Sequence, residues 1–228
     1  MAEASHLLYH KQMVEVKCRF LVIDRILGAK KPRTFNEDFD NEVMWLQLRQ
    51  IVELITFSAI AADEARYAAK RSKDGGNNDY RKDGKAGKIL EHLQQISPHF
   101  LPQPIGPIKV NPDGSKHIDY GATQATLDRL KSIHETAGEG LHAHNPFDPD
   151  SEAKQAAARV NTREQIKVES AYLKGVIWEH YKIGLEWAAG DDPCTPANGE
   201  CAWLIVFGRP DAPDIQMALA TALPTPAG

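Results

Sequence analysis

The segment from Glu37 to about Arg71 constrains the fold of this chain more than any other segment. Its apolar residues recur at helical spacing on two sides of the segment instead of one. The first stripe is Met44, Leu48, Ile51 and Ile55, and the second is Val43, Leu46, Leu54 and Phe57. Acidic residues crowd the start of the segment, where they suit the positive end of a helix dipole. A helix that is apolar on two sides is usually central, so we expect this helix to be the most buried.

Four other segments are predicted to be helical from the same periodicity. They cover residues 5–27, a short stretch around 89–96 that Pro98 ends, a stretch from about 123 to 137, and a long stretch from about 150 to 189. Within the last stretch, Thr162 and Gln165 match a capping box, which places a kink or a second helix start near Asn161. The stripe of this long helix includes Ile166, Leu173 and Tyr181.

Two regions lack helical periodicity. Residues 98–121 carry several prolines, and the segment Asn111-Pro-Asp-Gly114 has the composition of a tight turn, so we expect a β-hairpin or an extended loop there. The short β-branched and aromatic run at 201–207 predicts a strand, with residues 215–223 as its partner or as a loose tail. The predicted fold is therefore mainly α. An antiparallel bundle of about five helices would occupy residues 1–190, and a small β or irregular appendage would occupy 191–228.

Composition narrows the class of protein. Of the 228 residues, 42% are hydrophobic and 25% are charged, which excludes wholesale disorder. A net charge of −4 predicts no strong attraction of the whole chain to nucleic acid or membrane. The longest nearly apolar run, residues 54–62, is too short to span a bilayer. The first residues lack the pattern of an export signal. Cys194 and Cys201 are expected to be free thiols, and a cytoplasmic location is expected.

One loop departs from the acidic balance of the chain. Residues 66–88 hold eight basic and three acidic side chains, a local charge of +5. Such a run is most often a solvated loop. If the protein binds RNA, this loop is the expected place, because phosphates attract cations and bases stack on aromatic rings. The candidate RNA contacts are Arg71, Tyr80, Arg81, Lys82 and Lys85.

A histidine-rich segment carries the candidate chemistry. Arg129 precedes His134 by five residues, and His142 and His144 follow within the same stretch. A guanidinium can hold a phosphate and an imidazole can transfer a proton near neutral pH. Five residues turn a helix by about 140° beyond a full turn, so Arg129 and His134 do not share a helical face. They would meet only through a helix break, a neighbouring helix or a second subunit; the alternative is that these histidines bond local carbonyls.

His142 is expected to be more buried and more hydrogen-bonded than His144. It follows Gly140 and precedes Pro146, which restrict a regular helix and free backbone groups that a fixed side chain can satisfy. His142 would then act as a structural cap or as a positioned acid or base.

A dimetal site is a further alternative. Glu-x-x-His occurs at Glu3/His6 and at Glu139/His142, and such a site needs additional glutamates from other helices. The candidates for those glutamates are Glu53, Glu64, Glu169 and Glu179. Because Glu3 is near the terminus and glycines flank Glu139, we expect no metal and no other cofactor.

Three features resemble the HEPN superfamily of prokaryotic helical-bundle proteins. They are the Arg-x4-His spacing of Arg129 and His134, the phrase LHAHNPF at 141–147, and the run KILEHLQQISPHFLP at 88–102. The resemblance implies an antiparallel bundle that dimerises. It also implies a metal-independent RNase or toxin-type effector in bacterial defence or stress response, with Arg129 and His134 or His142 at the dimer cleft. An antitoxin or another defence component would be a protein partner. Other members are inactive, so the alternative is a non-catalytic scaffold or interaction module of the same fold.

Overall fold

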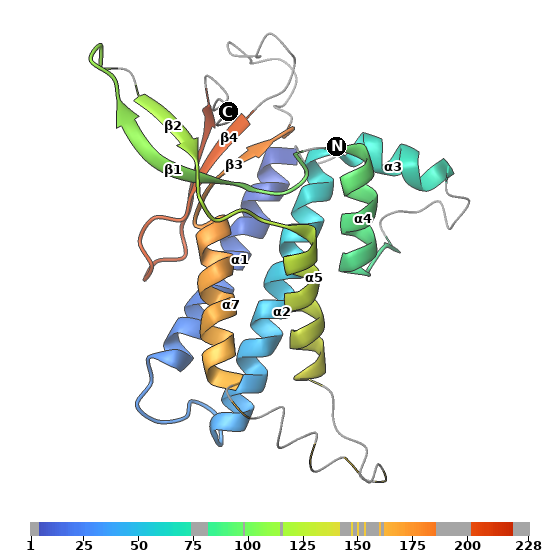
Figure 1. Ribbon diagram of the computed structural model, residues 1–228, viewed down its shortest axis with the longest axis vertical. Helices are drawn as coiled ribbons and strands as arrows, with labels where there is room; N and C mark the ends of the chain where they lie inside the picture. The colour runs from blue at the N-terminus through green and yellow to red at the C-terminus, as the bar shows by residue number, and fades with distance from the viewer. Residues whose placement is uncertain are drawn as a thin grey trace.

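The computed structural model describes residues 5–73, 82–97, 99–114, 116–141, 162–185 and 202–220, together with 147, 150, 153 and 160. The described part is mostly helical, with a small antiparallel sheet (Figure 1). The helices are α1 (Ser5–Leu27), α2 (Glu37–Ala62), α3 (Glu64–Lys73), α4 (Ala86–Ile96), α5 (Leu127–Glu139) and α7 (Thr162–Ile177). The strands are β1 (Gln103–Val110), β2 (Lys116–Tyr120), β3 (Glu179–Ile183), β4 (Ala202–Val206) and β5 (Gln216–Ala220).

Helix α2 holds more buried residues than any other described helix, as its two-sided pattern predicts. Its first stripe, Met44, Leu48, Ile51 and Ile55, is completely buried. The second stripe is only partly covered, and Leu46 is 39% exposed. The start of α2 is capped by Asn36, whose side-chain oxygen accepts a hydrogen bond from the Phe39 N–H at 2.9 Å. Because α2 contacts α1, α4, α5 and α7, it forms the centre of the helical part.

The prediction that this helix continues to Arg71 is wrong. Asp63 leaves helical geometry, with φ −126° and ψ 27°, and its N–H bonds to the Ile60 carbonyl at 3.0 Å. The Asp63 carbonyl then accepts the first bond of α3, from the Tyr67 N–H at 2.8 Å. Helix α3 turns away from α2 in Figure 1. The periodicity does not reveal this turn because the end of α2 and the start of α3 are both rich in alanine, which has good helix propensity.

The C-terminal helix ends earlier than expected, and most of residues 151–161, where its predicted first part falls, lie outside the described residues. The described helix α7 begins at Thr162, where the capping-box pattern places a second start, and it ends at Ile177 instead of near Ala189. Residues 179–183 form strand β3, and Tyr181 belongs to this strand. Four consecutive residues of β3 are buried, from His180 to Ile183, because the strand pairs with both β1 and β4. Tertiary pairing thus overrides the helical pattern.

The five strands form one sheet in the order β2-β1-β3-β4-β5, and every pair is antiparallel. The expected hairpin is β1 and β2, with Gly114 at φ +81° and its N–H bonded to the Asn111 carbonyl at 2.9 Å. The expected C-terminal strand and its partner are β4 and β5. Strand β3 joins the two hairpins, so strands from both sides of residue 190 share the sheet, which lies at one end of the helices (Figure 1).

Buried polar groups tie the helices to this sheet. Tyr9 of α1 hydrogen-bonds His180 of β3 at 2.7 Å, and Lys17 of α1 donates to the carbonyls of Phe207 and Asp214 beyond β4. Lys182 of β3 is completely buried and donates to the His99 carbonyl at 3.0 Å. Burial lowers the pKa of Lys182 to about 8. These contacts join residues more than 80 positions apart, so they form only when the whole chain folds.

Among the described residues, α2 is long and apolar enough to cross a membrane by length and composition alone. Half of its apolar window is buried inside the protein.

Candidate functional site

Arg129 lies in the first turn of α5, next to the cap residue Thr126, whose hydroxyl accepts a bond from the Arg129 N–H at 3.2 Å. Its guanidinium forms an ion pair with Glu169 of α7 at 2.7 Å and lies 5.3 Å from the ring centre of Tyr172, also on α7. Glu169 is only 8% exposed. Burial raises the pKa of Glu169, and Arg129 opposes that rise. Arg129 therefore compensates a nearly buried carboxylate between α5 and α7.

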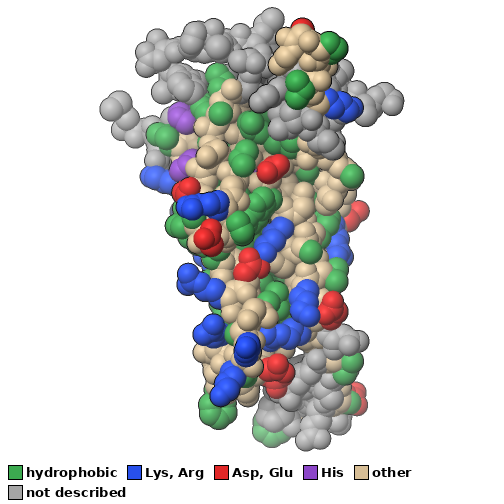
Figure 2. Space-filling model, turned by 90° about the vertical axis from the view of Figure 1, so that its left-hand side faces the viewer, with side chains coloured by type: hydrophobic (Ala, Val, Ile, Leu, Met, Phe, Trp, Pro, Cys, Tyr) green, Lys and Arg blue, Asp and Glu red, His purple; other side chains and the backbone are tan. Residues whose placement is uncertain are grey.

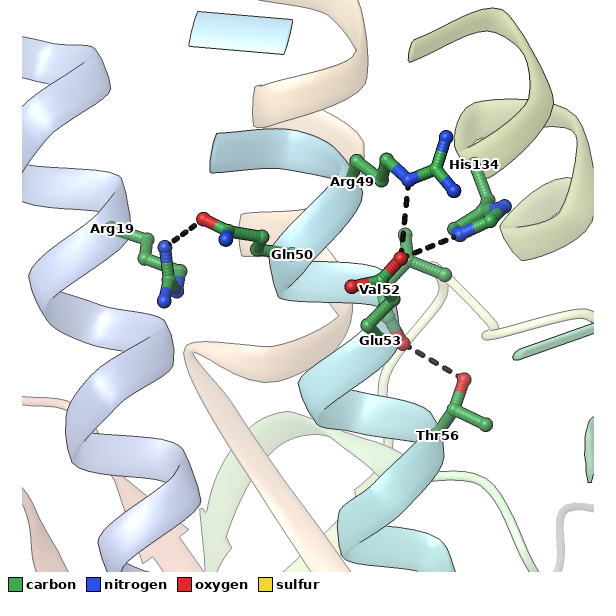
Figure 3. A network of polar contacts seen from close by, with 7 residues as sticks. All are labelled: Arg19, Arg49, Gln50, Val52, Glu53, Thr56 and His134. Carbon is green, nitrogen blue, oxygen red and sulfur yellow. Dashed lines mark hydrogen bonds and ion pairs between the residues drawn. The ribbon is translucent and has the colours of Figure 1, made fainter. Parts of the chain in front are cut away.

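His134 lies on the side of α5 that contacts α2. Its Nε2 is 2.9 Å from Oε1 of Glu53, and the same oxygen accepts a bond from Nε of Arg49 at 3.1 Å (Figure 3). The three side chains remain partly accessible, with exposed fractions of 35% for Arg49, 27% for Glu53 and 20% for His134. We call these three residues the α2–α5 cluster. It brings a guanidinium and an imidazole to one carboxylate.

Two glycines allow α5 to approach α2 beside this cluster. A Cβ at Gly138 would lie 2.8 Å from Nη1 of Arg49, and a Cβ at Gly140 would lie 2.8 Å from Cδ1 of Trp45. Both distances are shorter than a carbon atom tolerates. Gly138 is inside α5 and leaves the space that the Arg49 guanidinium occupies. The glycines that weaken the helix pattern in the sequence therefore have a packing role.

The structure does not bring Arg129 and His134 together within one chain. One contacts α7 and the other contacts α2, in agreement with the rotation of about 140° between them. The guanidinium beside His134 belongs to Arg49, which the sequence patterns did not single out, and Glu53 was a candidate only as a metal ligand. The available signal was the spacing of four residues between Arg49 and Glu53 on an otherwise apolar helix.

Several predicted residues lie outside the described part of the chain. His142 and His144 do, so the prediction that His142 is the more buried is not tested. The same applies to Tyr80, Arg81, Cys194, Cys201, and Glu3 of the first Glu-x-x-His motif. Within the described residues, no group of three or more histidine, cysteine, aspartate or glutamate side chains could hold a metal ion.

The basic loop contributes to a cavity of about 470 Å³ beside α3 and α4. Arg71, Lys82 and Lys85, three of the predicted RNA contacts, line it. Arg71 donates to both carboxylate oxygens of Asp83, from Nε at 2.7 Å and from Nη2 at 3.0 Å. The face in Figure 2 differs from the lining of this cavity. On that face, positive and negative side chains are interspersed, and apolar side chains lie between them. Charge of one sign is thus concentrated at the cavity but not on that face.

Comparison of the chain with protein-family models, with curated proteins and with solved structures finds no significant match.

Proposed function

We propose that the protein is a HEPN-like, metal-independent endoribonuclease that acts as a homodimer in bacterial defence or stress response. The proposal includes an antiparallel bundle of α1, α2, α5 and α7 and a cytoplasmic location. The observation that carries it is the α2–α5 cluster, in which Arg49 and His134 bind the same partly exposed carboxylate of Glu53. Each of the three groups matches a step that RNA cleavage without metal requires.

In this reaction the 2′-hydroxyl of a ribose attacks the adjacent phosphorus, and the bond to the 5′-oxygen breaks. His134 accepts the proton of the 2′-hydroxyl, and the leaving 5′-oxygen takes a proton from water. Because Nε2 of His134 is engaged by Glu53, transfer from the substrate uses Nδ1. Glu53 orients the imidazole through this contact. Arg49 binds Glu53 through Nε, which leaves its terminal nitrogens for the phosphate oxygens.

The test is cleavage of total RNA by the purified protein, with and without EDTA. The wild-type protein is expected to cleave in both conditions. His134→Ala and Arg49→Gln are each expected to reduce the rate by about 100-fold, a typical loss for an acid–base or charge-stabilising group. Arg129→Gln is the matched control, because it removes a guanidinium from α5 that the Glu169 ion pair already occupies.

Cleavage that EDTA abolishes would overturn this proposal, because it would indicate a metal-dependent reaction. If Arg129→Gln abolished cleavage and Arg49→Gln did not, only the role of Arg49 would be overturned. The guanidinium would then be that of the Arg-x4-His motif, with His134 or His142 completing the site from a second subunit.

The second candidate function is a non-catalytic scaffold or interaction module, with an antitoxin or another defence component as its partner. It is favoured by the interhelical character of the contacts: Arg129–Glu169 joins α5 to α7, and His134–Glu53 joins α5 to α2. A stable dimer in light scattering, with no RNA cleavage in any buffer, would support this function and exclude the first.

A further inference from the structure

The cavity beside α3 and α4 concentrates positive charge. Among the described residues that line it, four are cationic, Arg71, Lys82, Lys85 and Lys88, and one is a carboxylate, Asp83, which pairs with Arg71. The described lining is therefore mainly cationic, in a chain whose net charge is −4. A concave site with a one-sided charge focuses its field and attracts anions.

The wall of the cavity is held by a fixed ion pair. Arg71 and Asp83 form two hydrogen bonds, and they are only 16% and 19% exposed. The Tyr67 hydroxyl donates to Asp83 at 2.9 Å. Although burial opposes its charge, the bonds from Arg71 and Tyr67 lower the pKa of Asp83. These contacts fix Asp83, and with it the short segment that carries Lys82 and Lys85.

The start of α4 adds a second source of positive potential. Helix α4 has 11 residues and begins at Ala86, and its N-cap residue Lys85 makes no side-chain cap bond. The first N–H groups of a helix lack intrahelical acceptors, and an anion commonly satisfies them. Lys85 directly precedes this first turn and Lys88 lies within it, and both side chains are exposed. A phosphate at this point would receive backbone and ammonium donors together.

The floor of the cavity is apolar and aromatic. Its accessible ring is that of His92, which is half-buried and meets the Tyr67 ring edge to face with centres 6.2 Å apart. Tyr67 and Ile89 complete the floor but offer almost no accessible surface, since they are 0% and 1% exposed. A planar base can lie against the His92 ring, whereas a site for inorganic phosphate alone would not need an aromatic side chain. The volume of about 470 Å³ is in the range of small-molecule sites.

We propose that this cavity binds one nucleotide, with its phosphate at Lys85, Lys88 and the first turn of α4, and its base against the His92 ring of the floor. The nucleotide is either free or one unit of a single-stranded RNA. The site is separate from the α2–α5 cluster, so the proposal does not require RNA cleavage.

Binding is tested by calorimetry on the full chain with four probes: adenosine 5′-monophosphate, adenosine, inorganic phosphate and a hexaadenylate RNA. The double variant Lys85→Glu/Lys88→Glu is expected to weaken nucleotide binding at least about tenfold, since each lysine at a phosphate contributes to the salt-dependent affinity. The matched control is Lys30→Glu/Lys31→Glu. It makes the same change of net charge in the exposed connection between α1 and α2, at the opposite end of the helices (Figure 1), and is expected to bind as the wild type does.

The four probes separate the outcomes. Binding of the monophosphate that the Lys85/Lys88 change weakens supports a free nucleotide as ligand, and loss confined to the RNA supports a unit of a strand. Equal affinity for inorganic phosphate and the monophosphate would overturn the role of the floor. Absence of binding by every probe, or equal weakening in the control, would overturn the site. If the charge reversal unfolds the chain, Lys85→Gln/Lys88→Gln replaces it in the same tests, with a smaller expected loss of nucleotide affinity.

Discussion

Two histidines of this chain make contacts of opposite kinds. His180, at the junction of α1 and the sheet, is completely buried, and both ring nitrogens are bonded. Nδ1 donates to the Ile177 carbonyl at 2.8 Å, so Nε2 accepts the bond from the Tyr9 hydroxyl. His134, between α5 and α2, is 20% exposed and shares one carboxylate with a guanidinium.

The difference separates a structural imidazole from one that can exchange protons. Burial lowers the pKa of His180 to about 3, so this ring stays neutral at physiological pH. It links α1 to β3 and has no nitrogen left for a substrate. His134 keeps contact with water and lies beside Arg49 and Glu53. Residue type alone does not distinguish these two roles, but the number of fixed partners and the accessibility do.

The largest loss of stability is expected from breaking the buried hydrogen bonds of His180. His180→Leu removes both bonds, so the buried Ile177 carbonyl loses its imidazole donor and the Tyr9 hydroxyl keeps only its bond with Ser58, at a cost of about 3 kcal/mol in unfolding free energy. His134→Ala is the control and should cost less than about 1 kcal/mol, because its ion pair is partly exposed. Urea unfolding measures both values. Equal losses would show that the two histidines do not differ in structural role.

The second expected effect is that the stability of the protein depends on pH, because His180 is protonated in the unfolded chain but not in the folded protein. Its pKa is about 3 in the folded state, whereas the ordinary pKa of a histidine, which applies to the unfolded chain, is 6.5. Below pH 6.5 the unfolded chain therefore takes up a proton that the folded protein does not, and the unfolding free energy falls as the pH falls towards 3.

This contribution is expected to lower the stability by about 2 kcal/mol between pH 7.5 and pH 5. The measurement is the difference in urea-unfolding free energy between those two pH values, for the wild type and for His180→Gln. Carboxylates titrate equally in both proteins, so the wild type should lose about 2 kcal/mol more than the variant. Parallel pH profiles would contradict the neutral buried ring.

A smaller effect is expected at the shared carboxylate. Glu53→Gln keeps the size of the side chain but removes its charge, and the loss of stability should stay below about 1 kcal/mol because the cluster is partly exposed. The same unfolding assay measures it. A loss near that of His180→Leu would indicate that the α2–α5 cluster is structural, in favour of the non-catalytic function.

The smallest stability change is expected for Gly138→Ala. Alanine favours the helix by about 1 kcal/mol relative to glycine, and the new Cβ displaces the Arg49 guanidinium, whose Nη1 is 2.8 Å away. The two effects oppose each other, so the unfolding free energy should change by less than about 1 kcal/mol. The rate of RNA cleavage should fall while stability holds. Unchanged cleavage would argue against Arg49 as the group that binds phosphate.

Where the helices lie is largely contained in local sequence patterns. The bounds of α1, the start of α2 at an acidic cluster, the turn of the β1–β2 hairpin and strand β4 all follow from periodicity, capping and turn residues. The break at Asp63 does not, because the residues on both sides of it favour helix, and the strand at 179–183 does not, because it depends on pairing with distant strands. For the candidate site, the sequence pointed to His134 and to the basic loop, but it paired His134 with Arg129 instead of Arg49.

By itself, the sequence determined which residues are apolar along each helix, where caps and turns occur, and that cations gather between residues 66 and 88. These are local properties, fixed by neighbours within about one helical turn. Only the tertiary structure decided that His180 is buried and neutral, that Glu53 joins Arg49 to His134, and that Arg71 and Lys85 line one cavity. Their physical reason is the same: burial, ion pairing and pocket shape arise between residues distant in the chain, once α2 and the sheet have assembled.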